Sequence, residues 1–154
     1  MKIMKWLFGV LFMMVIMALT IVVFARTSLL IFLDIPSLVL VLICPFGLLL
    51  IQYGPSRFAR YFSAAFGSRP VEAPIVKKSE FFFRKLGHYF LLTGGVFFIT
   101  GIIMALSDIS NTEAIGVNLA VALLTLLYGL LLDMLLAQPL VVFCREKLLK
   151  DEII

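Results

Sequence analysis

Four long apolar stretches constrain the fold of this 154-residue chain more than any other feature. They cover residues 6–25, 35–53, 87–106 and 114–138, and short polar connections separate them. Each approaches or exceeds the ~20 residues that a helix needs to cross the hydrocarbon core of a bilayer. With 63% hydrophobic and 14% charged residues, the chain lacks the polar surface that a soluble domain requires. The sequence therefore predicts an all-α, polytopic membrane protein with four transmembrane helices in one domain, 1–154.

The first apolar stretch has an alternative interpretation as a cleaved signal peptide. Lys2 and Lys5 make a basic start, and Val23-Phe24-Ala25 resembles a cleavage site. The apolar run nevertheless exceeds the ~7–15 residues of a signal core. We therefore interpret residues 6–25 as a true first span.

The basic residues fall almost entirely on one side of the predicted bundle. All but Arg26 of the 13 Lys and Arg residues lie before the first span, between the second and third, or after the fourth. By the positive-inside rule, both termini, the inner loop 54–86 and the tail 139–154 are predicted to be cytoplasmic. The net charge of +4 needs no nucleic-acid partner, and it favours anionic lipids of the bilayer.

Residue types that carry catalysis or bind metals are sparse. His88 is the single histidine, and the two cysteines, Cys44 and Cys144, have no metal-ligand spacing and lie in no predicted outer loop. The sequence contains no catalytic triad, nucleotide-binding glycine loop or HExxH pattern. We expect no enzyme activity, no catalytic residue, no bound metal and no cofactor.

The inner loop contains a predicted amphipathic cytoplasmic helix over residues 56–66, after Gly54-Pro55 ends the second span. Phe58, Phe62 and Phe66 recur at helical spacing on its apolar face, and Arg57 and Arg60 lie at the edge of its polar face. Such a helix suits the membrane interface, with the rings in the bilayer and the guanidinium groups outside. A bend is expected from Arg69 to Pro74. Anchoring of the helix ends is the simpler role for these residues, and a partner-binding site is the alternative.

Small and polar residues form stripes on the third and fourth spans. Gly87, Gly94 and Gly101 recur every seven residues and are predicted helix-packing positions, because small residues let helices approach closely in lipid. Thr100 lies beside this stripe. The fourth span carries a stripe at spacings of three or four, which we expect to face protein or water: Asn118, Ala122, Thr125, Gly129 and Asp133.

Three single residues in the spans are open to interpretation. Asp133 is costly within a span, by about 2.5–3.5 kcal/mol on insertion scales, but it lies near the cytoplasmic end. It either supports packing as a hydrated or paired carboxylate, with His88 or Lys85 as partner, or it has an ion-linked role. Asp34 precedes a helix start, so capping alone explains it. Pro45 predicts a kink in the second span.

Two stretches resemble the MotA branch of the MotA/TolQ/ExbB family of ring-forming subunits in ion-driven membrane motors. The first is Phe32-Leu33-Asp34-Ile35-Pro36-Ser37 and the apolar residues that follow, which is similar to the start of the family's second span. The second, residues 115–129, resembles its distinctive fourth-span motif. Gln138-Pro139-Leu140 is similar to the proline-containing end of that span.

The resemblance implies a homo-pentamer around two helices of a single-span MotB-, TolR- or ExbD-like partner, with protons or sodium ions passing along the interface. Thr125 would face this central pair, and Asp34 would match the family's aspartate at the outer mouth of the second span. The candidate ion-pathway or partner-facing residues are Thr125, Thr100, Asn118, Gly129, Asp133 and Asp34.

Departures from the family pattern support an alternative. Leu126, Phe98 and Leu91 stand where family members usually have a hydroxyl, a threonine and a proline. The connection 54–86 is too short for the long cytoplasmic domain of flagellar ring subunits. The alternative function is therefore a non-conducting structural or accessory membrane component with the same fold. A stand-alone transporter or channel would need oligomerisation to enclose a path.

Overall fold

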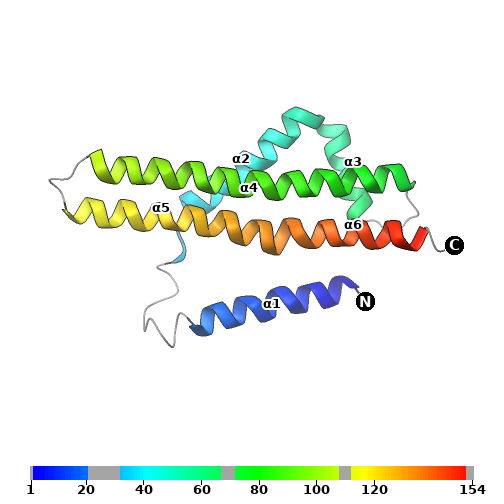
Figure 1. Ribbon diagram of the computed structural model, residues 1–154, viewed down its shortest axis with the longest axis horizontal. Helices are drawn as coiled ribbons and strands as arrows, with labels where there is room; N and C mark the ends of the chain where they lie inside the picture. The colour runs from blue at the N-terminus through cyan, green and yellow to red at the C-terminus, as the bar shows by residue number, and fades with distance from the viewer. Residues whose placement is uncertain (1, 21–31, 67–71, 108–111, 152–154) are drawn as a thin grey trace. The chain divides into compact units, whose positions relative to one another are not determined.

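The computed structural model describes residues 2–20, 32–66, 72–107 and 112–151, and within these ranges it contains helices and no strand (Figure 1). The chain divides into two compact units, Met1–Ile35 and Pro36–Ile154. The helices are α1 (Lys2–Thr20), α2 (Ile35–Tyr53), α3 (Pro55–Phe66), α4 (Ala73–Ser107), α5 (Thr112–Leu132), a π-helical turn (Asp133–Ala137) and α6 (Gln138–Asp151).

Three helical segments of the described chain are long and apolar enough to cross a membrane: Ile35–Tyr53, Ala73–Ser107 and Thr112–Leu149. The prediction of an all-helical fold is thus confirmed within the described residues, and three of these helices could span a membrane. The apolar helical stretch in the first unit, Phe8–Thr20, is shorter. The remainder of the predicted first span, residues 21–25, lies outside the described residues, so the count of four spans stays a prediction.

The connection between the second and third predicted spans is largely helical. α3 occupies the place of the predicted amphipathic helix, and α4 begins at Ala73, well before the apolar segment 87–106. Pro74 therefore lies in the first turn of α4, where proline is well tolerated, and not in the expected bend. Hydropathy marks where the bilayer ends, but lysine and glutamate are good helix formers, so a helix continues beyond that boundary.

The length of α4 places part of it outside the hydrocarbon core. Its 35 residues extend ~52 Å at the rise of an α-helix, whereas the hydrocarbon core is only ~30 Å thick. The predicted span, residues 87–106, has the length of one crossing. With this span in the bilayer, the preceding part, which carries Lys77, Lys78, Glu80 and Arg84, would project beyond the core.

Gly54 makes the reversal between α2 and α3. Its φ of 76° lies in the left-handed region that favours glycine at a helix end. The Gly54 N–H donates to the Leu50 carbonyl at 2.9 Å, and the Gly54 carbonyl accepts from the Phe58 N–H at 3.1 Å. Pro55 occupies the first position of α3. After this turn α3 runs back toward α4 (Figure 1).

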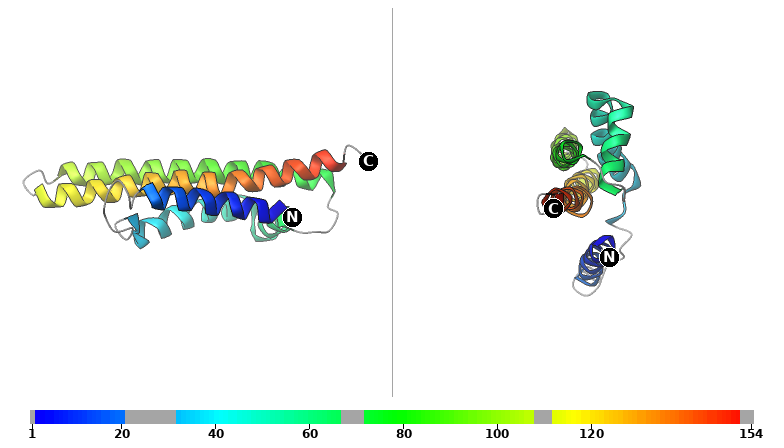
Figure 2. Two further views of the ribbon diagram at one scale, coloured as in Figure 1. Left: turned by 90° about the horizontal axis from the view of Figure 1, so that it is seen from below. Right: turned by 90° about the vertical axis from the view of Figure 1, so that its right-hand side faces the viewer.

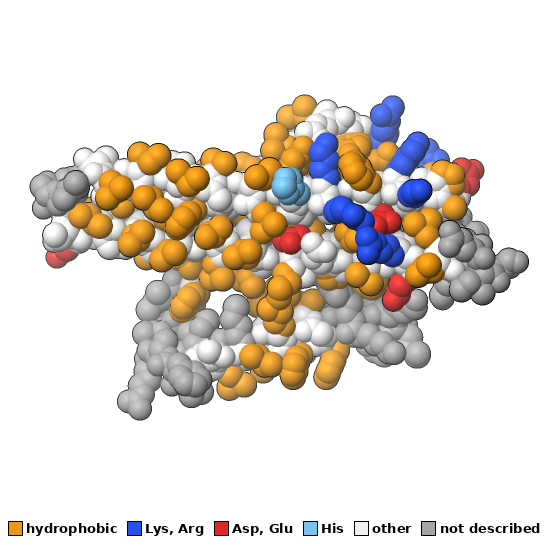
Figure 3. Space-filling model, viewed as in Figure 1, with side chains coloured by type: hydrophobic (Ala, Val, Ile, Leu, Met, Phe, Trp, Pro, Cys, Tyr) orange, Lys and Arg blue, Asp and Glu red, His pale blue; other side chains and the backbone are white. Residues whose placement is uncertain are grey.

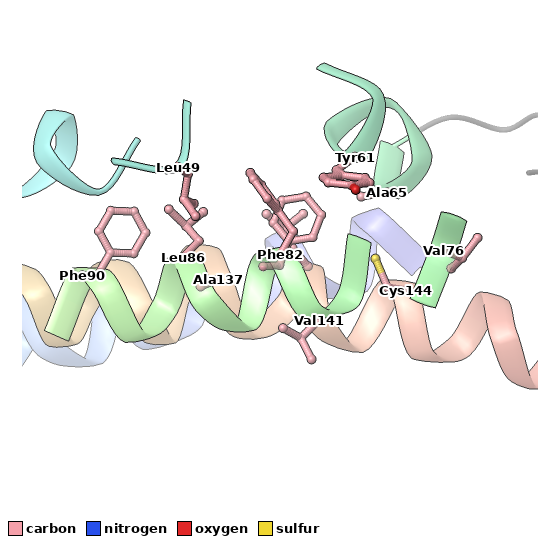
Figure 4. Packing of buried hydrophobic residues seen from close by; sticks show 12 residues of the cluster. Leu49, Tyr61, Ala65, Val76, Phe82, Leu86, Phe90, Ala137, Val141 and Cys144 are labelled. Atoms are coloured by element: carbon pink, nitrogen blue, oxygen red, sulfur yellow. The ribbon is translucent and has the colours of Figure 1, made fainter. Parts of the chain in front are cut away.

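α4 and the continuous rod from α5 to α6 form a long antiparallel pair, and α2 and α3 lie beside it (Figure 2). One face of α4 carries side chains that are fully buried against these neighbours. Figure 4 shows Phe82, Leu86 and Phe90 pointing toward Leu49 of α2 and Tyr61 of α3. Ala137 and Cys144 close the cluster from the α5–α6 rod.

The apolar face of α3 packs inside the chain. The ring centroid of Phe82 lies 5.4–5.8 Å from three rings of α3, and the ring of Tyr53 on α2 lies 5.3 Å away. The three α3 rings are Phe58, Tyr61 and Phe62. The expectation that the α3 rings enter the bilayer is thereby corrected for Phe58 and Phe62, because α4 and α2 supply aromatic partners from distant parts of the sequence. Phe66 is 49% exposed, and for this ring the expectation stays a prediction.

Candidate functional site

The glycine stripe of α4 faces the small-residue stripe of α5. A Cβ atom at Gly94 would lie 2.9 Å from the carbonyl oxygen of Thr125 and 3.2 Å from the Cα of Gly129. A Cβ atom at Gly101 would lie 2.6 Å from the Cβ of Ala122. The two helix backbones therefore meet at a distance that only glycine permits, as in other close helix pairs in lipid.

Thr125 lies inside this helix pair. Its side chain is 5% exposed, and Oγ1 donates to the Ala122 carbonyl at 2.7 Å. The hydroxyl donor is thus used within α5. The family resemblance implies that Thr125 faces a central partner, whereas within this chain it faces α4.

Asp133 opens the π-helical turn in the rod between α5 and α6. The Gln138 N–H donates to the Asp133 carbonyl, which is the i→i−5 bond of a π turn. Pro139 follows directly, and its ring would collide with the carbonyl of Leu135 in a regular α-helix. We attribute the wider turn to this proline. Single π turns of this kind are frequent at functional sites.

The carboxylate of Asp133 accepts hydrogen bonds from Gln138. Nε2 of Gln138 lies 3.1 Å from Oδ1 and 3.3 Å from Oδ2. On the facing helix, a Cβ atom at Gly87 would collide with Oδ1, so the glycine makes room for the carboxylate. Asp133 itself remains partly exposed.

The ion pairs described for the chain join Asp133 to neither of its predicted partners, Lys85 and His88. Nζ of Lys85 stands 5.6 Å from the ring centroids of both Tyr53 and Tyr89, and His88 is exposed. Sequence reasoning missed Gln138 because side chains five residues apart point about 140° apart on an α-helix. Only the π turn brings the two onto one side, and Pro139 was the available signal for it.

The other candidate residues do not join this site. Thr100 is exposed on α4, and its Oγ1 donates to the Val96 carbonyl at 2.9 Å. Asn118 is half-buried on α5. Asp34 directly precedes α2 and belongs to the other compact unit, and Pro36 lies in the first turn of that helix. These places agree with the capping interpretation of Asp34.

A polar network that sequence reasoning missed ties α6 to α4 outside the apolar segment. Oε1 of Glu80 lies 2.7 Å from Nη2 of Arg84 and 2.7 Å from Nε of Arg145. The hydrogen bond from Arg145 holds the pKa of Glu80 below its ordinary value, and Arg84 adds to the effect. Nζ of Lys147 donates to the Ala64 carbonyl at 2.6 Å, which satisfies the C-terminus of α3.

Within the described residues, no group of three His, Cys, Asp or Glu side chains could hold a metal ion. Comparisons with protein-family models and with curated proteins give no match. The resemblance to the MotA branch thus stays a prediction from residues 32–42 and 115–129.

Proposed function

We propose that this chain is a ring-forming subunit of an ion-driven membrane motor or energy-transducing complex. It would have four spans, cytoplasmic termini and a place in a bacterial inner membrane, and it would work with a single-span MotB- or ExbD-like partner. Protons or sodium ions would be the coupling ion. The observation that carries the proposal is the Asp133 carboxylate at a π turn in the predicted fourth span.

The surroundings of Asp133 favour ion exchange over a purely structural ion pair. Its described donor is the neutral amide of Gln138, which brings no positive charge to hold an anion in place. A proton or sodium ion at the carboxylate therefore competes with no described cation bonded to it. Acidic residues in membrane segments usually face a bundle interior or cavity and serve a function.

The second candidate, a non-conducting structural or accessory component, is favoured by a different observation. Thr125 and Gly129 lie in the contact between α5 and α4, and the Thr125 hydroxyl donates a hydrogen bond within its own helix. The part of the stripe that is buried within one chain needs no partner protein to explain it.

Flux measurements on the complex, purified with its partner and reconstituted into liposomes, separate the two candidates. We expect Asp133→Asn to reduce ion flux to the background of empty liposomes while the ring still assembles. Gly87→Ala retains the Asp133 carboxylate but forces it to move, so flux should fall as well. Gly95→Ala is the matched control, since a Cβ there meets nothing within 4 Å.

Native mass spectrometry of the same preparations reports assembly. Five copies of this chain with two of a single-span partner would support the motor architecture. Normal flux in Asp133→Asn would contradict the ion-linked proposal and favour the accessory function. Thr125→Val tests the role implied by the family resemblance: loss of flux with intact assembly is expected for ion coupling, and normal flux for packing alone.

A further inference from the structure

A basic groove of about 800 Å³ opens between α3 and the first turns of α4. Arg57 and Arg60 line it from α3, and Lys77 and Lys78 line it from α4. Figure 3 shows how Lys and Arg side chains gather toward one end of the α4–α6 pair, while hydrophobic side chains cover the rest of that face. The groove belongs to this charged end of the molecule.

No described carboxylate lines the groove. The described acid of the same stretch of α4, Glu80, is paired with Arg84 and Arg145. Four cations with no carboxylate among the described lining residues form a field that attracts a negatively charged ligand. Guanidinium groups suit phosphate in particular, because their planar donors match its oxygens in pairs.

The aromatic lining places the groove at the membrane boundary. Tyr53 is the last residue of α2, whose length matches one crossing of the hydrocarbon core. Phe81 also lines the groove and is 62% exposed, although the next residue, Phe82, is fully buried. Exposed aromatic rings beside basic residues are typical of the headgroup level of a bilayer. This depth favours a phosphate that is attached to a lipid over one from the aqueous phase.

We propose that this groove binds the phosphate headgroup of an anionic phospholipid from the adjoining leaflet. Arg57 and Arg60 on one wall and Lys77 and Lys78 on the other hold the phosphate. Tyr53 and Phe81 contact the apolar part of the lipid next to the headgroup. Basic pockets beside transmembrane helices bind anionic headgroups by this combination of charge and depth. The proposal is independent of ion conduction.

Native mass spectrometry of the gently purified complex, with added phosphatidylglycerol or phosphatidylcholine of equal chain length, tests the site. The test variant is Arg57→Gln/Lys78→Gln, which removes one exposed cation from each wall. The control is Arg84→Gln/Lys85→Gln, which removes the same charge from α4 residues that do not line the groove. A third arm adds inorganic phosphate as a competitor for the phosphatidylglycerol.

The unaltered protein and the control should retain phosphatidylglycerol over phosphatidylcholine, and the test variant should lose about tenfold or more of this preference. Inorganic phosphate at millimolar concentration should displace little of the lipid. Equal retention of both lipids by the unaltered protein would overturn the proposal. So would an equal loss in the two variants, which would indicate non-specific charge attraction. Full displacement by inorganic phosphate would assign the groove to a soluble anion instead.

Discussion

The two halves of α4 pack against different neighbours by opposite means, the apolar half against α5 and the charged half against rings of α2 and α3. In the apolar half, Gly94 and Gly101 let the backbone of α5 approach to contact distance. In the charged half, Phe82 and Phe83 are fully buried and large, and they fill the space between α4 and its neighbours with rings. One helix thus packs through glycines, which have no side chain, at one end and through large aromatic side chains at the other.

The solvent on each side accounts for the difference. In lipid, burying an apolar side chain gains little, since the acyl chains are equally apolar, and close van der Waals contact is the available attraction. Outside the hydrocarbon core, water makes the burial of a large ring favourable, and edge-to-face contacts between rings add to this. The change from glycine contacts to aromatic contacts along α4 therefore follows the change from lipid to water along its length.

The largest effect is expected from removing a buried ring in the charged half of α4. Phe82→Ala should destabilise the protein by about 3–5 kcal/mol, because it removes a fully buried ring and leaves a cavity between α3 and α4. Phe81→Ala is the matched control: its ring is exposed, and a change within about 0.5 kcal/mol is expected. Equilibrium unfolding in mild detergent measures both. Equal effects of the two variants would contradict the aromatic core.

A smaller effect is expected in the glycine half. Gly94→Ala should cost about 1–3 kcal/mol, because the new methyl group meets the backbone of α5, which cannot yield as a side chain can. Gly95→Ala adds the same methyl group where nothing lies within 4 Å, and it should gain up to about 1 kcal/mol from helix propensity. Opposite signs in unfolding experiments would support the close helix pair. Two stabilising substitutions would argue against it.

The smallest effect concerns the ion pairs of the charged half. Because the pKa of Glu80 is lowered in the folded state, its contribution to stability is present above the ordinary value of 4.5 and is lost as the pH falls through the folded pKa. Glu80→Gln should remove on the order of 1 kcal/mol at neutral pH, since both arginine partners are more than half exposed.

Thermal unfolding from pH 7 to pH 3 checks this assignment. The unaltered protein should lose stability in the acid range, and the difference between it and Glu80→Gln should shrink over the same interval. Arg84→Gln provides the control, because it leaves the hydrogen bond from Arg145, the main cause of the shift, in place. A constant difference across this range would show that Glu80 does not titrate in the way that its contacts require.

The sequence predicted helix ends and helix faces well where one kind of residue, apolar or glycine, determines them. The bounds of α2 follow from the apolar run between Asp34 and Gly54-Pro55, and hydropathy shows both ends. The register of the glycine stripe follows from a spacing of seven residues. By contrast, hydropathy did not reveal that α4 begins at Ala73, because a polar segment can be a loop or a helix in water.

The long-range contacts required the tertiary structure for physical reasons. The Arg145–Glu80 pair joins residues 65 positions apart, and Lys147 donates to the Ala64 carbonyl 83 positions away. No local sequence pattern therefore predicts either contact. The donor to Asp133 depends on the π turn that precedes Pro139, which changes which side chains share a face.

The sequence by itself therefore determined the helical class, the apolar segments and the surfaces available for close packing, because these depend on composition and on period along one helix. Only the tertiary structure decided which surfaces meet. It directed the rings of α3 to Phe82 and the stripe of Thr125 and Gly129 to the glycines of α4. The physical reason is that a small or aromatic face specifies how closely a partner can pack, but not which partner packs there.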